Sequence, residues 1–310
     1  MQVSVLLETV FLFLLLMIPG FLMGKCKALP DEATAGIGNI IMYIAMPALV
    51  FTKLLQTDLK ALQLTATLCC ILLPIALGLV LLLLGKLVFR GGTSGDRATG
   101  RFCSAFPNCG FWSIPLACVL FSQQPEVAVY VSIFNVFNSF LLLTAGSSVL
   151  SGNRGRLSVR QLLANPVLVA IILGSAMSLS GWKPSLANRV AEYLSALATP
   201  LSMVVLGAEA AKLKLREVFL KPEVYLACGL KLLVSPLLAT TFLWLLKQLR
   251  FSVSETLCAA VFLSTAVSTA LSAPSMAAKF NLNARYAAAL TIGTTLLCVI
   301  TMPLLYMLIF

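Results

Sequence analysis

The chain has 310 residues, of which 60% are hydrophobic and 11% are charged, and its mean hydropathy is +1.00. A soluble domain of this length cannot cover so much apolar surface, so the composition excludes an ordinary globular enzyme and predicts membrane-spanning helices. The net charge of +11 does not indicate a nucleic-acid-binding protein, because the cytoplasmic loops of membrane proteins collect Lys and Arg.

Ten apolar stretches, each long enough at about 20 residues to cross a bilayer, are separated by short polar joints. We expect spans at 3–24, 33–56, 61–89, 98–122, 126–150, 161–181, 187–211, 222–247, 253–279 and 284–309. The first has no basic leader and carries Pro19 and Gly20 late in its length, so we expect a retained helix rather than a cleaved signal. The fold class expected is an all-α integral membrane protein.

The basic residues fall mostly on one side of these ten spans. Fifteen of the 22 Lys and Arg residues lie in or near the joints after spans 1, 3, 5, 7 and 9, and six lie on the other side. Because cytoplasmic loops are the basic ones, the sequence predicts a multi-pass protein of the plasma or inner membrane with both termini outside. The joint at 152–160 is then cytoplasmic.

Proline interrupts two of the expected spans near their middles. Span 4 carries Pro107, with Pro115 close behind, and span 9 carries Pro274. A proline inside a helix removes a backbone donor and clashes with the preceding turn, so we expect both helices to open. Opened backbone must be buried in protein or line a polar cavity, and a pair of such breaks indicates the binding site of a transporter.

The prolines also suggest that the chain contains two related halves. Prolines fall at 47, 74 and 115 in spans 2, 3 and 4, and at 200, 236 and 274 in spans 7, 8 and 9. Five spans in each half would invert the second copy relative to the first. We therefore expect two inverted five-helix repeats, at 1–152 and 161–310. The alternative is coincidence, because transmembrane helices tolerate proline.

Residues 106–116, with the sequence FPNCGFWSIPL, closely resemble the FPNxGFxGxPL element of the auxin efflux carrier family of bacterial and plant transporters. Weaker matches are Asn165-Pro166, residues 199–203 with Gly207, Lys231 five residues before Pro236, and the Ser/Thr-rich run before Pro274. The chain departs from the family at Ser113, where glycine is frequent, and at Glu209, where an uncharged residue is usual.

This resemblance implies a fold like that of the bile-acid symporters and the plant PIN carriers. Spans 1, 2, 6 and 7 would form a scaffold, and spans 3–5 and 8–10 a transport domain in which broken spans 4 and 9 cross at the midplane. The function implied is secondary transport of small organic anions by an elevator-type mechanism. Malate, malonate, other carboxylates and auxin-like indole carboxylates are all candidates, and the direction of transport stays open.

Residues at the two breaks have the chemistry to bind an anion. A half-helix that begins at a break presents unpaired N–H groups and a partial positive charge. We expect the substrate to contact Asn108, Cys109, Gly110, Asn135, Asn138, Ser272, Ser275, Thr291 and Thr294. Pro107, Pro115, Pro274 and Lys231 are expected to have structural roles. The alternative for the amides and hydroxyls is hydrogen bonding between helices without a ligand.

Two ionisable groups inside the spans need an explanation, because charges at membrane depth are costly. Lys231 lies well inside span 8, where it either braces freed carbonyls of span 9 or holds a substrate carboxylate. Glu209 and Lys212 are three residues apart and are expected to pair with each other.

Several kinds of site have no residues to form them. The chain has no His, its nine Cys form no CxxC pair, and it contains no Gly-rich phosphate loop. We therefore expect no enzyme, no cofactor, no metal site and no ATP-driven pump. The expected partners are a small organic anion and the lipid bilayer, not nucleic acid, and a homodimer through the scaffold helices stays open. The alternative function is a membrane sensor that keeps the carrier fold and binds an anion without moving it.

Overall fold

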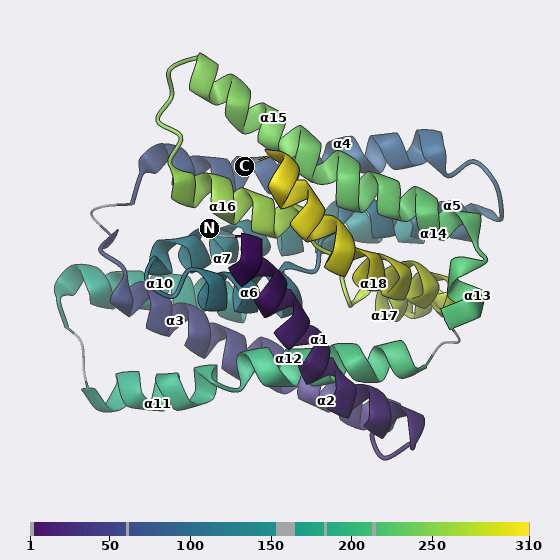
Figure 1. Ribbon diagram of the computed structural model, residues 1–310, viewed down its shortest axis with the longest axis horizontal. Helices are drawn as coiled ribbons and strands as arrows, with labels where there is room; N and C mark the ends of the chain where they lie inside the picture. Colours follow the sequence, from purple (N-terminus) through teal and green to yellow (C-terminus); the bar gives the residue numbers. More distant parts are fainter. Residues whose placement is uncertain (1–2, 60–61, 153–164, 183–184, 213–214, 310) are drawn as a thin grey trace.

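A computed structural model of the chain describes residues 3–59, 62–152, 165–182, 185–212 and 215–309. The described residues form helices joined by turns, with one isolated antiparallel bridge between Pro107 and Thr269 (Figure 1). Seven continuous helical runs are long and apolar enough to cross a membrane. Three shorter apolar helices are Cys109–Leu120, Pro166–Ser180 and Glu255–Thr265. The expected all-helical class is confirmed for the part of the chain that the structure covers.

The first half contains α1 (Val3–Lys25), α2 (Asp31–Ile40), the π-helical turn η1 (Ile41–Ala45), α3 (Met46–Gln56), α4 (Leu64–Val88), α5 (Ser94–Ala105), η3 (Cys109–Ser113), α6 (Ile114–Leu120), α7 (Pro125–Leu141), η4 (Leu142–Gly146) and α8 (Ser147–Ser151). The second contains α10 (Pro166–Ser180), α11 (Ser185–Ser195), α12 (Ala198–Ala211), α13 (Leu215–Phe219), α14 (Pro222–Cys228), η5 (Gly229–Val234), α15 (Ser235–Gln248), α16 (Glu255–Thr265), α17 (Ala273–Lys279) and α18 (Ala284–Ile309).

Three of the π-helical turns lie directly ahead of a proline. The turns η1, η3 and η5 each end two residues before one, at Pro47, Pro115 and Pro236 respectively. A proline ring clashes with the carbonyl four residues earlier, and the wider π turn moves that carbonyl aside. These prolines are therefore accommodated without ending the helical run.

Several expected boundaries differ by a few residues from those in the structure, and the differences at the fourth and sixth spans have visible causes. The fourth span begins at Ser94 rather than at 98, because Thr93 and Asp96 form a capping box that starts α5 within the polar joint. The sixth begins at Pro166, where the Asn165 side chain accepts from the backbone N–H of Val167 at 2.9 Å. The expected residues 161–164 of that span lie outside the described part of the chain.

Helix α1 crosses α12 at very close range. A Cβ added to Gly20 would collide with the carbonyl oxygen of Val204, and one added to Gly207 would collide with the carbonyl oxygen of Met17. Small residues at a crossing let two helix backbones pack directly, which is how helices associate strongly in lipid. Helix α10 packs on α3 in a similar way, with Gly174 against Leu54.

The helices run mainly between two ends of the molecule. In Figure 1, α3 ends and α4 begins at the left, where α15 also passes into α16. Helix α4 passes into α5 at the right, where α1 also passes into α2. Many apolar side chains on the outer faces are exposed, such as Leu72 and Leu83 on α4, as expected where helices face lipid.

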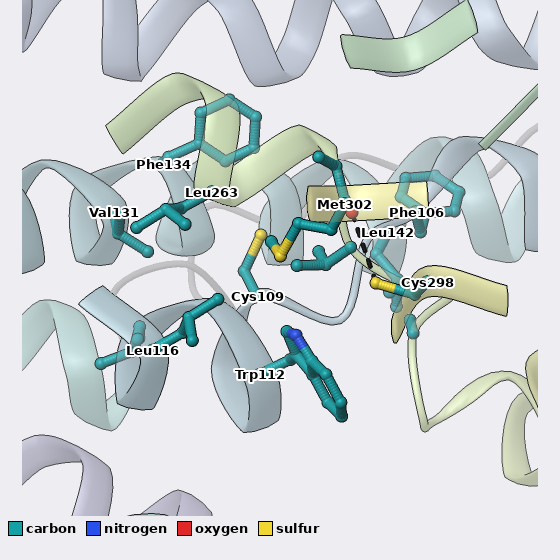
Figure 2. Close-up of a cluster of buried hydrophobic side chains, with 14 of the residues drawn as sticks. Phe106, Cys109, Trp112, Leu116, Val131, Phe134, Leu142, Leu263, Cys298 and Met302 are labelled. Atoms are coloured by element: carbon teal, nitrogen blue, oxygen red, sulfur yellow. Dashed lines mark hydrogen bonds between the residues drawn. The ribbon is translucent and has the colours of Figure 1, made fainter. Parts of the chain in front are cut away.

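A cluster of buried side chains surrounds η3, which follows the non-helical residues 106–108. Figure 2 shows Cys109 and Trp112 from η3 beside Phe134 from α7, Leu263 from α16 and Met302 from α18. The Trp112 ring also meets Phe13 of α1 edge to face, with 5.9 Å between ring centroids. The cluster therefore joins both halves of the chain and connects η3 to α1.

Candidate functional site: the meeting point of two interrupted helices

The fourth and ninth expected spans are each interrupted by a non-helical segment, and these two interruptions lie against each other. Helix α5 ends at Ala105 and η3 begins at Cys109, whereas α16 ends at Thr265 and α17 begins at Ala273. The backbone N–H of Asn108 donates to the Ser268 carbonyl at 2.9 Å, and that of Ala270 donates to the Phe106 carbonyl at 2.8 Å. Backbone groups that lack a helical partner in one interruption thus form hydrogen bonds with backbone groups in the other.

Side chains satisfy other backbone groups around the interruptions. The Thr269 hydroxyl donates to the Cys103 carbonyl at 2.6 Å, and the Thr269 N–H donates to the hydroxyl oxygen of Thr294 at 3.2 Å. The Ser113 hydroxyl donates to the Leu263 carbonyl at 2.7 Å. Ser113, which departs from the family pattern, therefore adds a hydrogen bond between the two interrupted segments that glycine could not make.

A cavity of about 90 Å³ opens beside this meeting point. Its lining includes residues 107–111 and 270–272, which surround the two interruptions, and Asn135, Asn138 and Ser139 of α7. The opposite wall comes from Met42 and Met46 near η1 and from Val167 of α10. None of the described residues that line this cavity is charged.

The Asn108 side chain is the most informative group in this cavity. The residue is 3% exposed, and its amide nitrogen Nδ2 has no hydrogen-bond partner among the described residues. A buried amide donor without a partner costs roughly 1–3 kcal/mol. Its position on the cavity wall, beside the first N–H groups of η3, makes it available to a ligand acceptor.

Asn135 and Asn138 face the same space from α7. Neither side chain makes a hydrogen bond within the described part of the chain, although both line the cavity. A Cβ added to Gly110 would lie 3.9 Å from both amide atoms of Asn135, so Gly110 keeps that amide accessible. The structure therefore brings together Asn108, Cys109, Gly110, Asn135, Asn138 and Ser272 of the expected binding residues.

The three other expected binding residues do not line this cavity. Ser275 is exposed on α17. Thr291 lines a separate small cavity of about 10 Å³ with Leu271 and Met17. Thr294 is buried and its hydroxyl supports the backbone at Thr269. The α18 hydroxyls of Thr291 and Thr294 therefore do not line the cavity that contains Asn108.

Lys231 does not make the bracing contacts that its position suggests. It is fully buried in η5, and its Nζ has no hydrogen-bond partner among the described residues. Two of the freed carbonyls in this segment have other donors: the Asn108 N–H donates to the Ser268 carbonyl, and the Cys298 thiol donates to the Ala266 carbonyl at 3.4 Å. Lys231 also does not line the cavity.

Glu209 pairs with Lys212, as expected from their spacing. The carboxylate lies 2.6 Å from Lys212 Nζ, and Asp31 lies 2.8 Å from the same nitrogen. Burial alone would lower the pKa of Lys212, but hydrogen bonds to Asp31 and Glu209 outweigh it and raise that pKa above its usual value. The second departure from the family pattern thus ties the end of α12 to the start of α2.

A larger cavity, of about 660 Å³, lies near the joint between α15 and α16, and none of the residues of either interruption belongs to its described lining. Lys247 and Glu255 line it together with Gln123, Gln124 and Tyr306. Volume alone does not identify a binding site in a membrane protein, because lipid and solvent fill such surface hollows. We assign the candidate site to the smaller cavity, where freed backbone and an unpaired buried amide converge.

Other residues that line the cavity were not anticipated from the sequence, including several from the second and sixth spans. Met42, Met46 and Val167 are ordinary apolar residues of the second and sixth spans. Their residue type does not show whether their side chains face a cavity or face lipid. The proline at 47 marks the right part of the second span, but it does not identify these two methionines.

Comparison with known proteins finds relatives that are named as transporters. A relative from Methanothermobacter thermautotrophicus, named an uncharacterized transporter, is 27% identical over 310 residues that cover 96% of each chain. An uncharacterized transporter from Methanocaldococcus jannaschii is 26% identical over 214 residues, covering 65% of this chain and 68% of its own. A Rhizobium meliloti relative with the provisional name malonate transporter is 23% identical over 235 residues, covering 71% and 70%.

The sequence pattern of the membrane transport protein family matches residues 5–306, nearly the whole chain. Together with the apolar helices, this match identifies a multi-pass membrane protein that transports rather than catalyses. The chain therefore belongs to the membrane transport protein family, in agreement with its resemblance to the auxin efflux carriers.

Proposed function

We propose that the protein is a secondary transporter of small organic anions and that the substrate binds beside Asn108. The observation that carries this proposal is the buried, unpaired Nδ2 donor of Asn108 on the cavity wall. An anion accepts hydrogen bonds, so it would satisfy this donor together with the first N–H groups of η3. A cation would be repelled by the partial positive charge of these N–H groups.

The size of the cavity favours a compact substrate. Its volume of about 90 Å³ is far below the roughly 300–1,000 Å³ of sites for drug-sized ligands. A short carboxylate such as malonate or malate therefore fits this site better than an indole carboxylate. The name of the Rhizobium meliloti relative points the same way, although that name belongs to the relative.

We further propose two inverted five-helix repeats that move by an elevator mechanism. In support, the pairing of spans is symmetric: α1 packs on α12 and α3 on α10, while α5 packs on α18 and α7 on α16. The cavity lies between η1 and α10 on one side and the two interruptions on the other. A scaffold of α1–α3 and α10–α12 and a transport domain of α4–α8 and α14–α18 fit these contacts.

Counterflow in proteoliposomes tests the proposal. Vesicles loaded with unlabelled malonate should take up labelled malonate from outside, and Asn108→Ala should remove most of this exchange. Asn188→Ala is the matched control, because that amide already bonds Glu192 on an exposed face at 2.9 Å. Equal competition by neutral malonamide would exclude an anion site. Malonate binding without any exchange would instead favour a sensor.

A further inference from the structure

Four basic side chains converge on a cavity of about 410 Å³ at the joint between α4 and α5, and this cavity shares no lining residue with the candidate transport site. They are Lys86, Arg90, Arg97 and Arg101, and the lining is completed by Phe89, Ser94, Ala98 and Val149. No carboxylate belongs to the described lining. Such a concentration of positive charge in one hollow differs from basic residues scattered along loops.

The local sequence explains why these side chains meet. Lys86 lies in the last turn of α4 and Arg90 lies two residues beyond the end of that helix, whereas Arg97 and Arg101 are four residues apart on α5. Residues at this spacing share a helix face. Helices α4 and α5 pack closely, since a Cβ added to Gly85 would lie 3.1 Å from the Arg101 Cα. Both basic pairs are therefore directed to the same joint.

The four cations have no anionic partner within the described part of the chain. None of them forms an ion pair there. Arg101 Nε donates to the Leu82 carbonyl at 3.2 Å, and an Arg97 terminal nitrogen donates to the Gly92 carbonyl at 3.3 Å, so both guanidinium groups are held in place. The nearby Asp96 carboxylate is occupied by the Thr93 backbone and hydroxyl.

We propose that this cavity binds the phosphate group of an anionic phospholipid. Arginine forks match phosphate oxygens, and basic hollows between transmembrane helices are suited to anionic headgroups. Leu79 and Leu83, which are 44% and 64% exposed, lie on the α4 face that also carries Lys86. An acyl chain can follow this apolar stripe while its headgroup occupies the cavity, which a free phosphate cannot do.

Native mass spectrometry of the purified full-length chain tests the proposal. The protein should retain phosphatidylglycerol in preference to phosphatidylcholine. Arg90→Gln combined with Arg97→Gln should weaken this retention roughly 25-fold, because each basic group near anionic lipid contributes about a fivefold change in affinity. Lys25→Gln combined with Lys279→Gln is the control: both residues are exposed and basic but lie outside the cavity.

Three results would overturn the proposal. The first is equal retention of the two lipids, and the second is the same loss in the control pair as in the cavity pair. The third is displacement of the lipid by millimolar inorganic phosphate or glycerol phosphate, which would identify a soluble phosphate as the occupant. Melting of each variant in lipid-free detergent checks its folding. Lys86→Gln combined with Arg90→Gln replaces the first pair if Arg97→Gln does not fold.

Discussion

The backbone N–H of Asn108 donates a hydrogen bond to the carbonyl of Ser268 across 2.9 Å, linking the interruption in the first half of the chain to that in the second. This bond and its neighbour from Ala270 to Phe106 form the isolated bridge between Pro107 and Thr269. The Asn108 backbone is thereby fixed while its side-chain amide stays free. The backbone hydrogen bond thus fixes the position of Asn108, whereas the lack of a partner for Nδ2 leaves the side chain able to bind a ligand.

Thr269→Val should destabilise the protein, because the hydroxyl of Thr269 satisfies a carbonyl of Cys103 that lies in another segment. Loss of this buried bond should cost roughly 1–3 kcal/mol. Thr265→Val is the control: Thr265 is equally buried, but its hydroxyl bonds carbonyls of its own helix, which keep their backbone partners. Thermal melting in detergent measures both. Equal losses would mean that the bond between segments has no special weight.

Lys231→Met should leave the protein as stable as before or raise its stability by roughly 1 kcal/mol or more. The reason is that Nζ is buried without a hydrogen-bond partner in the described structure, and replacing a buried charge with an apolar group is often favourable. Melting of the ligand-free protein measures this, with exposed Lys247→Met as the control. A clear fall in melting temperature for Lys231→Met alone would restore its bracing role. Unchanged stability with lost malonate affinity would instead indicate contact with substrate.

Gly207→Leu should prevent correct folding, because any side chain at this position collides with the Met17 carbonyl oxygen in α1. The helices cannot separate without losing their packing in lipid. Gly36→Ala is the matched control, since a Cβ there meets nothing within 4 Å and alanine favours a helix. Monodispersity in size-exclusion chromatography reports the outcome. A well-folded Gly207→Leu protein would contradict the close crossing of α1 and α12.

A cross-link between the two walls of the candidate site should stop transport if one wall moves past the other. Met42→Cys on the η1 side and Ser272→Cys beside the second interruption line the same cavity. Bifunctional thiol reagents should abolish malonate exchange in the double variant, and a cleavable reagent should allow its recovery. Each single variant is the control. Full exchange with the link in place would rule out an elevator movement between these walls.

The orientation predicted from Lys and Arg can be tested at positions that the structure describes. In a Cys26→Ser background, Gln123→Cys should react with a membrane-impermeant thiol reagent from outside, whereas Gly91→Cys should not. Both positions are exposed in joints at opposite ends of the chain's spans. The opposite labelling pattern would reverse the inside and outside assignments, and labelling of both would reject the alternation of spans between them.

The positions of the apolar helices were predictable because their causes are local. Pro107 lies inside the first interruption, but the second covers residues 266–272 and Pro274 lies in the first turn of the following α17, so the sequence indicated the second interruption only approximately. The separation of Thr294 from Asn108 was not predictable, because it depends on the path of the backbone at Thr269. The role of Lys231 was not predictable for the same reason: whether a freed carbonyl needs it depends on donors distant in sequence, such as the Asn108 N–H and the Cys298 thiol.

The reciprocal bonds between Asn108, Ser268, Phe106 and Ala270 also constrain the order in which the protein can be made. Synthesis runs from the N-terminus, so Asn108 enters the membrane long before Ser268 has left the ribosome. Until then, the N–H of Asn108 and the carbonyl of Phe106 lack their final partners, and unpaired backbone in hydrocarbon costs several kcal/mol per group. The newly inserted first half therefore needs temporary shelter, from water or from the insertion machinery, until its second half arrives.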